Sequence, residues 1–432
     1  MRSIVEKSRG AMKIRLAYGR EGLDVDLPDH ATLIEPEYIP SLPDQTGALK
    51  DAVRNPIGTI PLRQSTFPGN KVGISVCDIT RPMPSERILP VLLRELAHIP
   101  PSDITIFLAT GTHRPNTNQE IELMLGEFVV KHGCKIVNHD AFDSKALTCV
   151  GNTKSGIPVF LNKEWVSCDV RITTGFVEPH FFAGFSGGPK MVAPGLAGFD
   201  TIMALHNAEM IAHPNAHWGL TNGNPIHDSI REIARMISVN FSLDVTINKN
   251  RGITSVYAGN LFAVHKAASR FALSTAMQEV NEPFDVVVTT NSGYPLDMNL
   301  YQAVKGMSAA SQIVKKGGSI ICVAECSDGI PNHGRYYEIL TSAESPAALL
   351  DMINTPGFNK HDQWQVQIQA LIQAKSNVYL KSDFLSNSQV KRAHLIPVED
   401  VAHTVNYLMR KTDNGTICVL PEGPQTIPFI RN

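Results

Sequence analysis

Short apolar runs alternate with segments of helical periodicity from Lys71 onward. The runs KVGISVCDI (71–79) and DITIFLATG (103–111) flank SERILPVLLRELAHI (85–99), whose apolar residues recur at helical spacing. Further strands are expected at CDVRITTG (168–175) and LDVTINKN (243–250). Continuous Val, Ile and Leu runs are typical of parallel strands buried on both faces. The pattern therefore predicts an α/β fold with a doubly wound sheet flanked by helices.

A second alternation follows the helix-like segment 261–280. It contains the strand-like runs FDVVVTTN, SIICVAEC and VYLKS and ends with the helical pattern EDVAHTVNYLMRK. We expect two domains, each with a mostly parallel sheet and helices, and an active site in the cleft between them. The expected N-terminal cofactor-binding and catalytic domain is 1–280, and the C-terminal domain is 281–415. The run TICVLPEG fits an edge strand of either domain, so the tail 416–432 can return to the first.

Composition narrows the functional class. The 432 residues carry a formal net charge of -2 without a long basic run, which argues against a nucleic-acid partner. Seven cysteines without CxxC spacing argue against a disulfide framework or a zinc ribbon. No apolar stretch has the length of a signal peptide or a membrane span. We expect a cytoplasmic protein with a small-molecule substrate.

Polar clusters follow three predicted strands. They are CDITRPMP, ATGTHRPN and GFVEPHFFAGFSGGPK. Ligands of open α/β sheets bind beyond the carboxyl ends of the strands, so these clusters predict one composite site.

The third cluster contains a candidate anion loop, in which several backbone N–H groups can converge. It is not a Walker loop, because Pro189 precedes Lys190 and Met191 follows it. A tight glycine turn with a solvated lysine is the simpler alternative. The loop positions are Gly184, Ser186, Gly187 and Gly188.

Ionisable residues in these clusters suggest acid–base chemistry on an acid substrate. His113 and His180 can each exchange a proton near neutral pH, although a single loop histidine is more often a surface or capping residue. Arg81 can hold a carboxylate, with Asp78 beside it; the alternative is a local ion pair between them. Lys305 opens a predicted helix of the second domain, where a solvated lysine is the simpler interpretation.

Familiar metal-binding spacings do not occur. There is no HExxH, and Pro214 interrupts the His213–His217 pair. His206 lies on a predicted helix and can supply one ligand, although a lone histidine is usually a satisfied polar contact.

Six ordered motifs between about residues 71 and 370 resemble the lactate racemase family. They are CDITRPMPS, ATGTHRP, EPHFFAGFSGGPK, PGLAGFDTIMALH, GYPLDMNLYQAVKGM and DQWQVQI. The resemblance implies a racemase or epimerase that inverts C2 of a 2-hydroxy acid, lactate-like or a sugar acid. The implied route is reversible hydride transfer to a nickel-pincer nucleotide through a 2-keto acid.

The resemblance also implies the site residues. Lys190 would carry the cofactor covalently, the glycine loop would hold its phosphate, and His206 would bind nickel. His113 and His180 would be the catalytic histidines. The implied substrate-binding residues are Asp78, Arg81, Tyr301, Gln302, Lys305 and Trp364. Pro189 stands where the family commonly has arginine, which leaves the substrate or the phosphate contacts open.

The implied partners are the 2-hydroxy acid and the proteins that make the cofactor. Two other functions would make different demands on the sequence. A conventional dehydrogenase would need a GxGxxG after a strand, which the sequence lacks. A noncatalytic sensor of sugar acids or nucleotides could keep Arg81 and the glycine loop, but it would not need Lys190, His206 and both histidines together.

Overall fold

The computed structural model describes residues 10–331, 334–412 and 415–430. These residues form two compact units, each of which is described by itself. The central unit comprises residues 38–275. The split unit combines the residues up to 37 with those from 276 onward.

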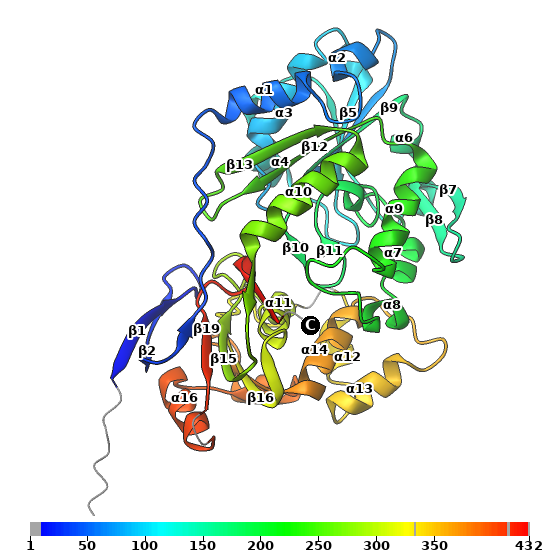
Figure 1. Ribbon diagram of the computed structural model, residues 1–432. Helices are drawn as coiled ribbons and strands as arrows, with labels where there is room; N and C mark the ends of the chain where they lie inside the picture. The colour runs from blue at the N-terminus through cyan, green and yellow to red at the C-terminus, as the bar shows by residue number, and fades with distance from the viewer. Residues whose placement is uncertain (1–9, 332–333, 413–414, 431–432) are drawn as a thin grey trace, which may run out of the picture. The chain divides into compact units, whose positions relative to one another are not determined.

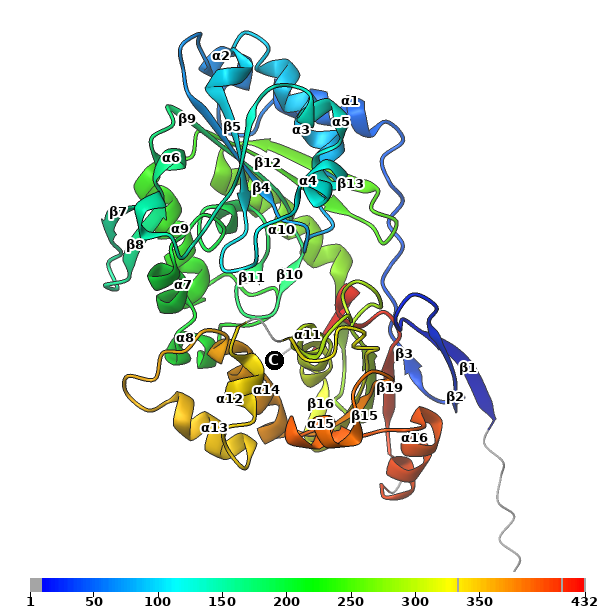
Figure 2. The ribbon, with the colours of Figure 1, turned by 180° about the vertical axis from the view of Figure 1, so that it is seen from behind.

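A six-stranded sheet organises the central unit (Figures 1 and 2). Its first five strands along the chain pair in parallel, and the last forms an antiparallel edge. In spatial order the strands are β13 (Ile253–Gly259), β12 (Phe241–Ile247), β9 (Val170–Phe176), β4 (Val72–Cys77), β5 (Ile104–Ala109) and β6 (Lys135–Asn138). The four strands predicted for this region are confirmed.

Helices cover both faces of this sheet, as the apolar runs require. Helix α10 (Leu261–Ala276) lies on the face seen in Figure 1, and α3 (Ser85–Glu95) and α4 (Asn118–Leu125) lie on the face seen in Figure 2. The helical pattern after Asn118 is interrupted by Gly126, whose φ of 79° ends α4 before the short helix α5 (Glu127–Val130).

The split unit contains a second six-stranded sheet, and all of its pairings are parallel. Helices α11 (Leu300–Ser311), α14 (Gln363–Lys375) and α16 (Val401–Arg410) pack near it. In spatial order its strands are β18 (Ile396–Pro397), β17 (Asn377–Lys381), β16 (Val314–Val323), β15 (Phe284–Thr290), β19 (Ile417–Leu420) and β3 (Thr32–Leu33). The α/β class with two mostly parallel sheets is confirmed.

The two compact units divide the chain differently from the expected domain limits at both ends. Strand β3 pairs with β19, so the residues before 38 belong to the split unit and not to a domain 1–280. The hairpin of β1 (Ala11–Leu16) and β2 (Leu23–Pro28) places Leu16 and Leu27 in the core of the same unit. Within the expected tail 416–432, β19 joins the sheet of the split unit between β15 and β3.

The predicted helix over 261–280 also ends early. Helix α10 stops at Ala276, and the next residues form β14 (Met277–Val280), which pairs with β20 (Ile427–Ile430). In residues 277–280, pairing with a strand distant in sequence therefore overrides the local helical pattern.

The structure also bears on disulfide bonds and on membrane-spanning helices. All seven cysteines are described, and none forms a disulfide. In the part of the chain that the structure covers, no helix is long and apolar enough to cross a bilayer.

Leu27→Ala should destabilise the split unit by about 2–5 kcal/mol, because it leaves a cavity at a side chain that is 1% exposed. Hydrogen exchange read by mass spectrometry should become faster in β19. Leu49→Ala, at a fully buried position of the central unit, is the matched control and should leave β19 unchanged. Faster exchange in β4 and β9 instead of β19 after the Leu27 change would contradict the assignment of the N-terminal hairpin.

Candidate active site

Three neighbouring strands bring the predicted central-unit residues to one edge of the sheet. Strand β4 lies between β9 and β5, and the chain leaves each strand at the same edge because all three are parallel. The order also reverses here, since β5 and β6 extend to one side of β4 while β9 and β12 extend to the other. Such a switch point is where open α/β sheets bind ligands.

His113 and Asp78 form a direct pair, although 35 residues separate them. His113 Nδ1 lies 2.6 Å from Asp78 Oδ2, and the other carboxylate oxygen accepts the Thr80 hydroxyl at 2.6 Å. The carboxylate is 4% exposed, whereas the imidazole is 42% exposed. A buried, anchored carboxylate thus orients an accessible imidazole.

The charge state of Asp78 fixes the tautomer of His113. Burial by itself raises the pKa of the carboxyl, but the charge and hydrogen bond of His113, the charge of Arg81 and the Thr80 hydroxyl lower it below its usual value. An ionised carboxylate can only accept, so His113 Nδ1 carries the hydrogen. The lone pair of the neutral ring is then on Nε2, which can act as a base.

Arg81 follows Asp78 in a tight turn closed by its own N–H, which donates to the Asp78 carbonyl at 3.2 Å. Among the described residues its half-buried guanidinium has only a 3.5 Å bond to the Thr80 carbonyl. The local Asp78–Arg81 ion pair considered as an alternative does not form, because Asp78 pairs with His113. A guanidinium so placed suits a carboxylate ligand.

The glycine loop is closed by internal hydrogen bonds of Ser186. Its N–H donates to the Glu178 carbonyl at 2.9 Å, and its hydroxyl donates to the Phe176 carbonyl at 2.9 Å. The same hydroxyl accepts the Glu178 N–H at 2.9 Å. In this conformation the N–H and the hydroxyl of Ser186 both form hydrogen bonds within the loop, and its role as a phosphate donor stays a prediction.

Two positions of the loop require glycine. Gly187 has φ 69° and ψ −164°, a region that is essentially restricted to glycine, and Gly188 has φ 48°. A Cβ on Gly187 would lie 2.9 Å from the Phe176 carbonyl oxygen, and one on Gly188 would lie 2.5 Å from the His265 ring. The loop is therefore pressed against its own supporting residues.

Lys190 follows in a 3-10 turn, Gly188–Met191, tied to the central strand. The Lys190 N–H donates to the Gly187 carbonyl at 3.1 Å, and the Ser75 hydroxyl of β4 donates to the Met191 carbonyl at 2.8 Å. The lysine backbone is thus fixed on both sides of the residue.

Phe182, which the sequence analysis did not single out, brings three predicted residues together. Its ring centroid lies 4.5 Å from that of His180 and 5.2 Å from that of His206, in both cases edge to face. The Nζ of Lys190 lies 5.6 Å from the same centroid. The proposed acid–base histidine, metal histidine and attachment lysine therefore surround one aromatic ring.

The two histidines around Phe182 have defined tautomers. His180, on β10 (Pro179–His180), accepts the Ala183 N–H on Nδ1 at 3.3 Å, so its neutral ring carries hydrogen on Nε2. His206, at the end of α7 (Phe199–Leu205), donates from Nδ1 to the Ile202 carbonyl at 2.7 Å. This bond leaves the lone pair of the buried His206 ring on Nε2, the form that binds metals.

Four predicted substrate residues cluster within the split unit, on α11 and α14. Trp364 Nε1 donates to the Tyr301 hydroxyl at 3.2 Å, and Lys305 Nζ donates to Gln302 Oε1 at 2.7 Å. Trp364 is 5% exposed, and the other three are half-buried. Lys305 is therefore a held cation, unlike the solvated lysine considered as its alternative.

Three further residues that support the site have only weak sequence signals. Asn224 is fully buried and caps α9 (Pro225–Ile237), while its Nδ2 donates to the Phe182 carbonyl at 2.9 Å. Asp244 is a single carboxyl within the apolar strand β12, and His265 lies on the buried stripe of α10. For Asp244 and His265, the sequence signal is an ionisable residue at a position that the apolar pattern predicts to be buried.

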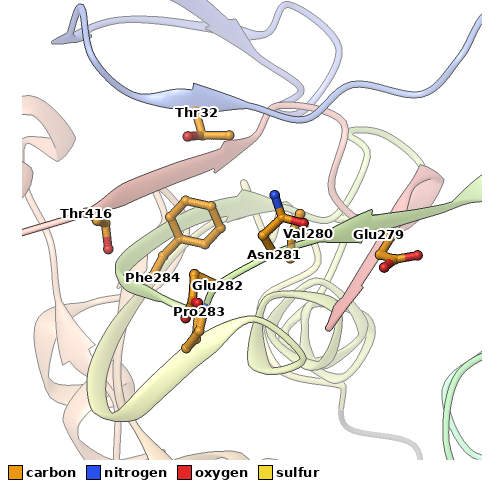
Figure 3. Close-up of a pocket in the computed structure, with 8 residues that line it drawn as sticks. All are labelled: Thr32, Glu279, Val280, Asn281, Glu282, Pro283, Phe284 and Thr416. Atoms are coloured by element: carbon orange, nitrogen blue, oxygen red, sulfur yellow. The ribbon is translucent and has the colours of Figure 1, made fainter. Parts of the chain in front are cut away.

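A shallow hollow of about 330 Å³ in the split unit lies apart from these residues (Figure 3). It opens where β15 and β19 begin, beside Phe284 and Thr416, and residues 281–283 also line it. Parallel α/β sheets bind ligands at the opposite, carboxyl ends of their strands, so this hollow is not the candidate site.

The Asp244 carboxyl should make stability depend on pH. Complete burial raises its pKa to about 7, against a smaller opposing effect of the Gly188 N–H. In the unfolded chain it ionises near pH 4, so between about pH 4 and 7 the folded state holds a proton that the unfolded state has released. Stability contributed by this group is therefore present at low pH and lost as the pH rises through 7.

The free energy of unfolding of Asp244→Asn, relative to that of the parent protein, should accordingly increase from pH 5 to pH 8, by on the order of a few kcal/mol. Urea unfolding at both pH values measures the difference. The exposed Asp228→Asn is the matched control. A difference that does not change with pH would mean that Asp244 has the same charge at both pH values.

Comparison with known proteins places this chain in a family. A model of the lactate racemase N-terminal domain matches residues 18–219, and a model of the lactate racemase C-terminal domain matches residues 280–427. The lactate racemase of Thermoanaerobacterium thermosaccharolyticum is 34% identical over 423 residues, covering 96% of this chain and 98% of the relative. The lactate racemase of Lactiplantibacillus plantarum is 36% identical over 383 residues, covering 87% and 89%.

Solved structures give the same result. The apoprotein of the Thermoanaerobacterium thermosaccharolyticum lactate racemase superposes with a TM-score of 0.89 at 33% identity, covering 98% of this chain and 100% of that chain. A Thermotoga maritima protein with a TM-score of 0.70 is 18% identical, covers 91% of this chain and 100% of that chain, and shows the fold alone. The sequence matches span both units, and the chain belongs to the lactate racemase family.

Proposed function

We propose that the protein is a racemase or epimerase that inverts C2 of a 2-hydroxy acid. Family membership indicates a racemase-type isomerase. The observation that carries the proposal is the grouping of His180, His206 and Lys190 around the ring of Phe182. A noncatalytic sensor would have no use for this grouping.

The cofactor we propose is a nickel-pincer nucleotide attached to Lys190. His206 would hold the nickel, since its Nδ1 bond favours the metal-binding tautomer. Within the described ranges no three His, Cys, Asp or Glu residues gather as a metal site, so further ligands would have to come from the organic group. His206 would be the protein's ligand, and imidazole nitrogen is a ligand that suits nickel. When bound, such a group supplies an acceptor for the hydride at C2, which is easier to remove than a proton.

His113 and His180 would transfer the hydroxyl proton, one as the base and the other as the acid. His113, held by Asp78, presents a lone pair on Nε2 and can remove the proton as the substrate becomes a flat 2-keto acid. To act as the acid, His180 would have to carry hydrogen on both ring nitrogens, which requires the Ala183 N–H contact at Nδ1 to open; Nε2 could then return a proton to the same oxygen after the intermediate turns. With the other enantiomer the two residues exchange roles, as reversibility requires.

Cations would hold the acid throughout the reaction. Arg81 is proposed as the main carboxylate partner, because Asp78 does not neutralise it directly. Lys305, held by Gln302, is proposed as the second cation, and the Tyr301–Trp364 pair would limit the size of the substrate. The Thermoanaerobacterium and Lactiplantibacillus relatives are lactate racemases, so lactate is the first substrate to test, followed by larger hydroxy acids.

Pro189 distinguishes this loop from the arginine common in the family. Proline has neither a side-chain charge nor an N–H, so an anion at the loop would lose two possible donors here. We propose that cofactor-synthesis proteins load this chain as they would other members, and that the substrate or phosphate contacts differ at this position.

Lys190→Ala should abolish covalent cofactor attachment and leave the fold intact, because the loop is shaped by Ser186 and the glycines. Intact-mass spectrometry of protein produced with the cofactor-synthesis proteins measures the adduct. The exposed Lys154→Ala is the matched control and should keep it. His206→Ala should keep the adduct and lose nickel. An adduct of unchanged mass on the Lys190 variant would refute the attachment site.

His113→Ala and His180→Ala should each slow racemisation by roughly 10²-fold or more, the usual effect of losing a positioned acid or base. Because each histidine serves one face, single-turnover reactions with each pure enantiomer should give unequal amounts of 2-keto acid in the two variants. Rapid quench and chromatography measure it. Normal racemisation by both variants, or no keto acid with the parent enzyme, would rule out two opposed histidines.

A further inference from the structure

We propose that Asp244 and His265 are positioning residues that hold the glycine loop from behind and thereby fix Lys190 for cofactor attachment. Neither touches the proposed reacting atoms. The inference rests on the proposed role of Lys190, but its structural part concerns the loop alone.

His265 supports the loop through one hydrogen bond and one steric contact. Its Nε2 lies 3.0 Å from the Ser186 carbonyl oxygen, and its ring occupies the space that a Cβ on Gly188 would need. The ring stacks at 5.7 Å on that of His227. Burial, the charge of His227 and the charge of Lys190 lower the pKa of His265 to about 3. The imidazole is therefore neutral, and its Nε2–H donates to the loop.

Asp244 supports the same segment from the sheet. It is opposite Gly175 in the β12–β9 register and is fully buried. A Cβ on Gly175 would lie 2.9 Å from Asp244 Oδ1 and 3.0 Å from Gly187 Cα, so the carboxyl and the loop backbone meet at one point. Neither carboxyl oxygen has a hydrogen-bond partner of ordinary geometry among the described residues. A buried carboxyl without such a partner is costly, which favours a specific role.

The two contacts reach Lys190 through a short covalent path. Gly188 is held by His265, and the Lys190 N–H is bonded back to the Gly187 carbonyl in the same 3-10 turn. A shift of the loop would therefore move the lysine backbone and withdraw Nζ from the Phe182 ring. Sites built on rigid, supported backbone hold reactive groups most precisely.

Paired variants test the proposal. His265→Leu removes the donor, whereas His265→Gln can place an amide N–H near the former Nε2. Asp244→Ala opens space behind Gly187, whereas Asp244→Asn keeps the shape. Hydrogen exchange of a peptide covering 184–192 should be about tenfold faster in the Leu and Ala variants, relative to a peptide from β9, and close to the parent in the Gln and Asn variants. Ser269→Ala, one turn further along α10, is the matched control and should change neither peptide.

Cofactor loading provides the second measurement. In protein produced with the cofactor-synthesis proteins, the Lys190 adduct should form more slowly in the Leu and Ala variants and at the parent rate in the conservative ones. Unchanged loop exchange in His265→Leu and Asp244→Ala would overturn the proposal, as would failure of Gln and Asn to restore protection. If the parent protein carries no adduct, the proposed attachment at Lys190 fails, and the exchange measurement still decides whether the two residues support the loop.

Discussion

Parallel pairing of β4 with β5 on one side and β9 on the other is the constraint on which the site depends. It brings Asp78, His113 and the glycine loop to one edge although they are far apart in sequence. A shift of one residue in either pairing would turn alternate side chains to the opposite face. The Val and Ile residues of β4 oppose such a shift, because they alternate along the strand and fill the core on one face, whereas the other face carries Gly73, Ser75 and Cys77.

Beyond the edge of this sheet, the chemistry depends on the neighbouring group that sets the tautomer of each imidazole. A carboxylate directs the hydrogen of His113, a main-chain N–H directs that of His180, and a main-chain carbonyl directs that of His206. Three histidines of the same residue type thereby acquire different chemical states.

The sequence predicted the strands well because continuous apolar runs leave few alternatives. It also predicted which loops carry the polar residues, since these follow the strands directly. The contacts that organise the site were less accessible. Asp78 was placed beside Arg81 by sequence proximity, yet it pairs with His113 across two strands. Phe182 looked like one of several apolar residues, and its importance lies in three ring contacts. The split unit was missed because a two-residue strand, β3, carries no periodic signal of its own.

The pairing of β3 with β19 also bears on the order in which the protein can form during synthesis. The central unit is one uninterrupted segment, so it can complete its sheet while the rest of the chain is still being made. The split unit needs its first strands and its last ones together, and the residues up to 37 must wait for β19 to leave the ribosome. Until then the core that the apolar side chains of the N-terminal hairpin share with β15, β16 and β19 is incomplete, and this interval is when a nascent chain is most exposed to misassembly.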